Sequence, residues 1–92
     1  MDDISIIKTI ILEKLLRSNI IGGKHIPLDF IKKSIPEIYR NTHSGKKSFA
    51  HALKDLLNNQ WLIIAKKRTG KDYDYHVSLN PRKIDEINEF IN

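Results

Sequence analysis

Residues 44–79 decide the fold of this chain and read SGKKSFAHALKDLLNNQWLIIAKKRTGKDYDYHVSL. Their first part, about 44–59, predicts a helix, because at about 100° per residue its apolar side chains gather on one side. These apolar residues are Phe49, Ala52, Leu53, Leu56 and Leu57. The opposite side carries Lys47, His51, Lys54 and Asn58. We therefore expect one side of the helix to pack on a core while the other offers cations to a partner.

Two strand-like runs follow this helix, joined by RTGKD at 68–72. The first run, Trp61 to Ala65, is short and mostly apolar, which suits a strand packed on the core. The second run alternates with polar residues, and its apolar members are Tyr73, Tyr75, Val77 and Leu79. This alternation predicts a half-buried strand with both tyrosines facing the core; stacking on nucleic-acid bases is the alternative. Together the runs predict a β-hairpin with a basic tip, about 66–73.

The segment before residue 44 predicts helices separated by breakers. Asp2 or Asp3 caps a first helix that runs to about Ser18, where Asn19 and then Gly22-Gly23 stop it. A short edge strand is expected around His25 and Ile26. Pro27 then starts a second helix, which ends near Ser34 because Pro36 disfavours helix at the residue before it. The apolar side of this helix is predicted to be made by Leu28, Phe30, Ile31 and Ile35.

Three further features complete the chain. A short turn is expected from Pro36 to Arg40, and Thr42 or Ser44 caps the next helix. That helix is predicted to stop at Asn58 or Asn59, since asparagine tolerates the left-handed conformation. Asn80-Pro81 restarts a last helix, whose apolar side is made by Ile84, Ile87, Phe90 and Ile91.

Length and composition predict one domain, residues 1–92, without a large catalytic cleft. No apolar run approaches the ~20 residues of a membrane span. The N-terminus opens with Asp2 and Asp3, unlike a signal peptide, so we expect a cytoplasmic protein. Cysteine is absent, which excludes disulfides and thiolate chemistry. We expect no cofactor and no small-molecule ligand.

The positive charge of the chain is concentrated in one third of its length. The net charge is +5, yet from Arg40 to Lys71 there are eight cations against one acid, Asp55. The rest of the chain carries eight cations and ten acids. A cluster of this kind is the electrostatic footprint expected of a surface that binds a phosphate backbone.

This order of elements resembles the winged helix-turn-helix superfamily over nearly the whole chain. The resemblance rests on Phe30-Ile31, on the apolar ridge from Phe49 to Leu57, and on NQWLI at 59–63, where helix turns into strand. Small Ile- and Lys-rich winged-helix proteins of archaea and their viruses look most alike. The resemblance implies an α+β fold with a three-helix core, a C-terminal β-hairpin wing and an additional C-terminal helix. One departure is the long connection from Pro36 to Ser44, which bears on the angle between the second and third helices.

The resemblance also implies double-stranded DNA as the partner, with the third helix, about 44–59, in the major groove and the wing on the backbone or minor groove. The expected role is that of a small transcriptional regulator. Lysines of the helix would contact phosphate or guanine, Asn58 would pair with adenine, and Arg68 is the best candidate for the minor groove. The expected DNA-binding residues are Arg40, Ser44, Lys46, Lys47, Ser48, His51, Lys54, Asn58, Lys66, Lys67, Arg68 and Lys71.

Two other functions remain open from the sequence. Winged helices also serve as protein-interaction modules within larger complexes. Asp72, Asp74 and His76 alternate along a strand and offer ligands for Mn²⁺ or Mg²⁺, as in a metal-dependent nuclease, although any half-exposed strand shows such alternation. The four histidines lack a zinc spacing. We therefore expect a protein that is not an enzyme.

The first helix is apolar over more than half of its circumference. Either a small domain wraps it on two sides, or part of it forms a dimer interface. Together with the apolar side of the last helix, the second interpretation predicts a homodimer through the first and last helices, on a roughly palindromic DNA site.

Overall fold

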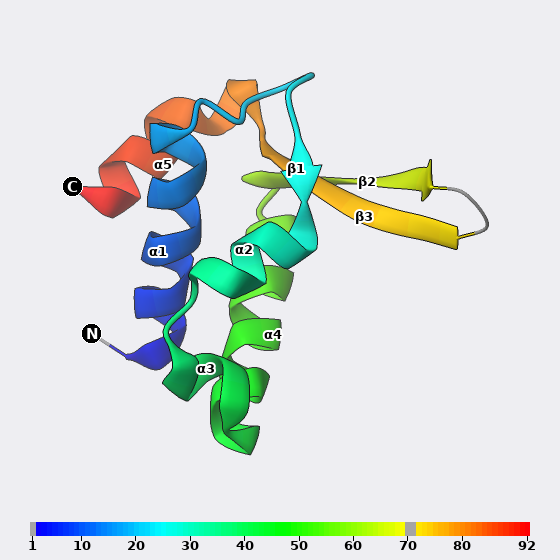
Figure 1. Ribbon diagram of the computed structural model, residues 1–92. Coiled ribbons are helices and arrows are strands. Elements are labelled where there is room, and N and C mark those ends of the chain that lie inside the picture. The colour runs from blue at the N-terminus through cyan, green and yellow to red at the C-terminus, as the bar shows by residue number, and fades with distance from the viewer. Residues whose placement is uncertain (1, 70–71) are drawn as a thin grey trace.

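The computed structural model describes residues 2–69 and 72–92 and has an α+β architecture (Figure 1). The elements are α1 (Asp3–Arg17), β1 (Ile26–Pro27), α2 (Leu28–Ser34), α3 (Glu37–Asn41), α4 (His43–Asn58), β2 (Leu62–Thr69), β3 (Asp72–Leu79), the 3₁₀ turn η1 (Pro81–Lys83) and α5 (Ile84–Ile91). The three strands form an antiparallel sheet in the order β1-β3-β2. In the described part of the chain, no helix has the length and apolar character needed to cross a membrane.

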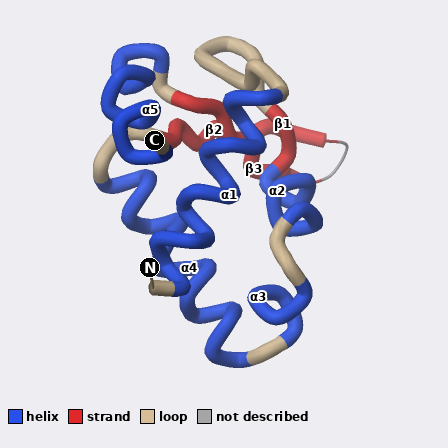
Figure 2. Tube along the Cα trace, turned by 90° about the vertical axis from the view of Figure 1, so that its left-hand side faces the viewer, coloured by secondary structure: helices blue, strands red, loops and turns tan. Residues whose placement is uncertain are grey.

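Helix α1 lies at the centre of the molecule, with α4 and α5 on one side and α2 on the other (Figure 2). Ile7, Ile11, Leu12 and Leu15 are fully buried on it. Ile4, Ile10 and Leu16 are partly buried against the same core. Most of the wide apolar circumference therefore packs on neighbours within the chain, and the dimer stays a prediction.

The ends of α1 agree with the sequence prediction. The carboxylate of Asp2 accepts a hydrogen bond from the Ser5 amide at 2.8 Å, which caps the first turn. The backbone hydrogen bonds of this cap also hold the pKa of Asp2 below its ordinary value. The helix ends at Arg17, and Asn19 takes the left-handed conformation with a φ of 55°.

The long connection between the second and third helices folds into α3, which packs against α4. Thr42 separates the two helices. Its hydroxyl accepts a hydrogen bond from the Gly45 amide at 3.0 Å and donates one to the Ile38 carbonyl. A Cβ on Gly45 would lie 2.6 Å from the Cα of Tyr39, so this close approach requires glycine. Thr42 is thus the N-cap of α4, as one of the two sequence alternatives predicted.

Helix α2 differs from expectation at one residue. Ile31 and Ile35 are buried as the apolar pattern predicted. Phe30, counted with them, is 54% exposed, and the ammonium of Lys33 lies 5.9 Å from the centre of its ring. Because the helix is short, Ile31 and the residues around it already occupy the side that packs on the core, and Phe30 stays exposed.

The β2–β3 hairpin is longer than the sequence predicted. Strand β2 continues through Lys66, Lys67 and Arg68, which were expected at the tip, and the hairpin projects from the body (Figure 1). Near the body, Leu62, Val77 and Leu79 are buried. Tyr75, predicted to face the core, is instead 52% exposed, because the strands extend beyond the helices that would cover it. The side chain of Tyr73 lies outside the described residues.

The turn after α4 is held in place by the side chain of Asn80. The left-handed residue is Gln60, with a φ of 62°, and not Asn58 or Asn59 as predicted. The amide nitrogen of the Asn80 side chain donates to the Gln60 carbonyl at 2.8 Å, and its oxygen accepts from the Arg82 amide at 3.1 Å. This second bond confirms the predicted cap before the last helix.

Helix α5 packs against α1 and also contacts Trp61, the residue before β2. The Trp61 ring meets the Phe90 ring edge to face at 5.4 Å between centroids. Its indole nitrogen donates to the Glu86 carboxylate at 3.0 Å. Ile87 is fully buried. The apolar side predicted for the last helix is therefore used mainly within the chain.

Candidate nucleic-acid interface

Four of the predicted site residues form one stripe on α4. Lys47, His51, Lys54 and Asn58 follow one another at intervals of four, three and four residues, which places them along one side of a helix. All four are exposed. The stripe lies opposite Ala52 and Leu56, which are fully buried. The sequence prediction of one packed and one polar side is confirmed for this helix. We call these four residues the α4 stripe.

Three other predicted residues of this region lie off the stripe. Lys46 is seven residues before Leu53 and shares its side of α4, toward α2 and α3. Ser48 is half-buried and shares its side of the helix with Asp55, which faces α1. Arg40 belongs to α3, and its guanidinium lies 3.8 Å from the Glu37 carboxylate. Ser44, exposed in the first turn of α4 and three residues before Lys47, lies on the same side as the stripe.

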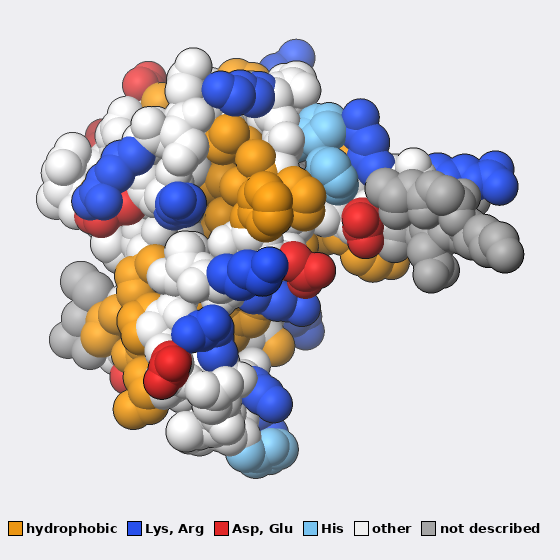
Figure 3. Space-filling model, viewed as in Figure 1, with side chains coloured by type: hydrophobic (Ala, Val, Ile, Leu, Met, Phe, Trp, Pro, Cys, Tyr) orange, Lys and Arg blue, Asp and Glu red, His pale blue; other side chains and the backbone are white. Residues whose placement is uncertain are grey.

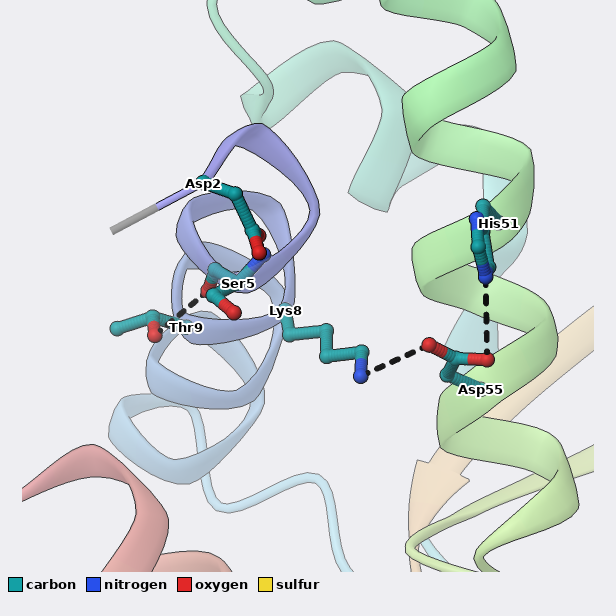
Figure 4. A network of polar contacts seen from close by, with 6 residues as sticks. All are labelled: Asp2, Ser5, Lys8, Thr9, His51 and Asp55. Atoms are coloured by element: carbon teal, nitrogen blue, oxygen red, sulfur yellow. Dashed lines mark hydrogen bonds and ion pairs between the residues drawn. The ribbon is translucent and has the colours of Figure 1, made fainter.

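A polar network joins the α4 stripe to the centre of the molecule (Figure 4). The ammonium of Lys8 on α1 lies 2.9 Å from one carboxylate oxygen of Asp55, and the other oxygen lies 3.6 Å from Nε2 of His51. The hydrogen bond from Lys8 holds the pKa of Asp55 below its ordinary value of 3.8, against the opposing effect of burial. Asp55 is thus paired from the core side, and it orients the imidazole of His51 on the surface.

The hairpin supplies the second group of cations. Lys66, Lys67 and Arg68 are exposed on β2, opposite Tyr75, Asp74 and Tyr73 in register. Alternation along the strand places Lys66 and Arg68 on one face and Lys67 on the other. Lys71 lies outside the described residues. Figure 3 shows Lys and Arg side chains along the projecting hairpin and over the lower helices, on both sides of a recess.

Two histidines meet where the hairpin leaves the body. Nδ1 of His25, just before β1, lies 2.9 Å from Nδ1 of His76 on β3. The rings are nearly perpendicular, at 77°. Desolvation lowers the pKa of His25 from its ordinary value, and nearby Lys67 and His76 add to this effect. One nitrogen of the pair must carry the proton and the other accept it.

The structure describes only some of the side chains that were predicted to bind metal in a nuclease. His76 is engaged by His25, and Asp74 is exposed. The side chain of Asp72 lies outside the described residues. Within residues 2–69 and 72–92, no three His, Asp or Glu side chains are placed together to hold a metal ion.

Three features of the surface were missed by sequence reasoning. They are the exposed Tyr75 beside Lys66, the contact of His25 with His76, and a groove between α2, α3 and α4. The first depends on how far the hairpin extends past the body, and the others depend on residues distant in the sequence. Neither the alternation along a strand nor the spacing along a helix indicates any of these three features.

No family model, no curated protein and no solved structure matches this chain. The functional assignment therefore depends on the geometry and charge described above.

Proposed function

We propose that this chain is a winged-helix protein that binds double-stranded DNA without catalysis. The observation that carries the proposal is the pairing of an exposed, basic α4 stripe with a projecting hairpin whose β2 strand bears Lys66, Lys67 and Arg68. The sheet order β1-β3-β2, with α4 leading directly into β2, is compatible with a winged-helix layout. A solvated helix alone would not require a second cationic element beside it.

In this proposal α4 enters the major groove. Lys47 and Lys54 contact phosphate or guanine, and Asn58 presents an amide suited to adenine. His51, held by Asp55, offers a ring nitrogen to a base edge. The hairpin lies along the backbone, where Lys67 and Arg68 hold phosphates. Phosphate contacts would dominate the affinity, and six of them imply a loss of about 10³-fold between 50 and 200 mM salt.

The biological role that fits this binding mode is a small transcriptional regulator or a DNA-associated accessory protein. A homodimer through α1 and α5 remains a prediction, and Phe90, 37% exposed on α5, is the apolar side chain most available for it. Sedimentation at high micromolar concentration tests it, since a monomer there would remove the palindromic site from the proposal.

The direct test is fluorescence anisotropy of labelled duplex DNA at several salt concentrations. The double variant Lys67→Ala/Arg68→Ala should weaken binding to every sequence alike and lower the slope of log affinity against log salt by about 1.8, or about 0.9 for each lost phosphate contact. The charge-matched control is Lys14→Ala/Arg17→Ala on α1, where both residues are exposed. Absence of wild-type binding at low salt, or equal loss in both variants, would remove the proposal.

Base reading by α4 is tested separately. Asn58→Ala should change the preference among duplexes, by about 1–3 kcal/mol at the base it reads, while leaving the salt slope nearly unchanged. Equal losses on all sequences would mean that α4 supplies only phosphate contacts.

A protein-interaction module is the second candidate, and one observation favours it. Ile38 on α3 is 63% exposed and Phe30 on α2 is 54% exposed, and exposed large apolar side chains are typical of docking surfaces. Under this alternative, Ile38→Ser would abolish partner binding. It becomes the favoured function if the anisotropy measurement finds no DNA binding.

A further inference from the structure

A groove of about 450 Å³ lies between α2, α3 and α4. Its floor is apolar and includes Leu28 and Ile35 at the two ends of α2, and Phe49 and Leu53 of α4. Helix α3 packs against α4, whereas α2 packs against α1, β1 and β3, which leaves the space between them open. The volume falls within the ~300–1,000 Å³ of small-molecule sites, whose linings are also mainly apolar.

The polar groups around this floor have one sign of charge. Lys32 of α2, Arg40 of α3 and Lys46 of α4 line the groove, and no acidic residue lines it within the part of the chain that the structure describes. In Figure 3 hydrophobic surface is visible between Lys and Arg side chains over the lower helices. An apolar floor with cations from three helices complements a molecule that has an apolar body and a negative group.

Arg40 supplies the specific signal for a carboxylate. Its side chain is 38% exposed although Nε is buried, which leaves the terminal nitrogens to meet a ligand. One of them meets the Glu37 carboxylate only at 3.8 Å, beyond ordinary hydrogen-bond length. A planar guanidinium is suited to hold a carboxylate through two parallel N–H bonds.

We propose that this groove binds a small monocarboxylic acid with an apolar, ring-sized body. The body lies on Phe49 and Leu53, and the carboxylate accepts hydrogen bonds from the two terminal nitrogens of Arg40. Lys32 and Lys46 add attraction without fixing the orientation, because an ammonium acts as a point charge.

One consequence rests on the proposed DNA-binding function. Lys46 belongs both to the groove and to the expected DNA-binding set, and it directly precedes Lys47 of the α4 stripe. A bound carboxylate neutralises part of the charge beside the α4 stripe and fills the space on which the position of α3 depends. The ligand therefore lowers the affinity for DNA.

The ligand site is tested without DNA, by amide chemical shifts of the full chain titrated with 2-naphthoate and with 2-naphthamide. These probes share one ring system and differ in charge. The acid should bind about tenfold more tightly or better, with the largest shifts at Tyr39, Phe49 and their neighbours. Equal affinities would show a merely apolar docking surface and overturn the proposal, as would shifts centred elsewhere or no binding at all.

Variants then assign the preference to Arg40. Arg40→Met keeps an apolar stem and should reduce naphthoate binding to the level of the amide, while amide binding stays the same. Lys24→Ala, at an exposed position that does not line the groove, should leave both affinities unchanged. A preserved preference in Arg40→Met would overturn the role of the guanidinium. The wild-type comparison of acid and amide stands even if Arg40→Met does not fold.

The DNA consequence is measured by anisotropy with and without saturating 2-naphthoate, and a fall in affinity is expected. If the unliganded protein does not bind DNA, only the proposed function fails. If DNA affinity is unchanged by bound 2-naphthoate, the site stands as a ligand site and its regulatory consequence is overturned.

Discussion

The apolar side chains of the helical core and those of the outer part of the hairpin differ in burial. On α1, Ile7, Ile11, Leu12 and Leu15 are completely buried. On the hairpin arm, which we define as residues 66–69 of β2 and 72–75 of β3, Tyr75 is half exposed and the lysines beside it are exposed. The difference is whether another element lies opposite. The core should therefore contribute most of the free energy of unfolding, whereas the arm presents charged side chains to solvent.

The largest expected effect comes from the core side of this comparison. Leu12→Ala removes a fully buried side chain between helices and should lower the free energy of unfolding by about 2–5 kcal/mol. Tyr75→Ala removes a larger side chain from the arm but should cost about 1 kcal/mol or less, because this side chain is already 52% exposed in the folded chain. Urea denaturation of both variants measures the two losses. Equal losses would mean that the arm is packed in solution, and the distinction between the regions would fail.

The contact of α3 with α4 should be nearly as sensitive as the core, although it lies at the surface. Gly45→Ala adds a Cβ that would lie 2.6 Å from both the Thr42 hydroxyl and the Tyr39 Cα. We expect a loss of about 1–3 kcal/mol, although alanine is the better helix former by about 1 kcal/mol. Thermal unfolding measures it.

The adjacent residue provides the control. Ser44→Ala lies in the same turn, is exposed, and should change stability by less than about 0.5 kcal/mol. If Gly45→Ala were neutral or stabilising, α3 would be free to move away from α4. The groove of about 450 Å³ would then not have a fixed shape.

Sequence reasoning succeeded where local rules decide the structure. The Asp2 cap, the stop at Asn19 and the helix end at Ser34 follow from side-chain chemistry within a few residues. It failed at Phe30 and Tyr75, where an apolar residue lacks an opposite neighbour. The α4 stripe was predictable from a spacing of 100° per residue. The groove around Arg40 was not, because it depends on how three helices pack.

A smaller effect is expected at Gln60, which joins the core helix α4 to the hairpin. Its φ of 62° is unfavourable for a residue with a Cβ, and its side chain is exposed. Gln60→Gly should therefore raise the free energy of unfolding by about 0.5–1 kcal/mol in urea denaturation. Asn59→Gly, at a φ of −81°, should instead destabilise, since glycine gains nothing there. The same sign for both variants would contradict a conformational origin.

The smallest effect should mark the boundary between the two regions, where His25 contacts His76. Burial, Lys67 and His76 lower the pKa of His25 in the folded chain. Below the ordinary histidine pKa of about 6.5, the unfolded chain binds a proton that the folded chain does not. Stability is therefore fully present above that pH and falls as the pH drops toward the lowered value. The melting temperature should therefore be lower at pH 5.5 than at pH 7. Protonation of His25 should also weaken the anchoring of β1 on the hairpin.

His25→Gln should flatten this dependence, whereas His43→Gln, at an exposed position on α4, should leave it unchanged. The carboxylates do not interfere, because the lowered pKa values of Asp2 and Asp55 start from 3.8 and their stabilisation is lost only in more acidic solution. An unchanged slope in His25→Gln would mean that the contact of 2.9 Å does not couple the hairpin to the body. Protonation would then leave the base of the arm intact.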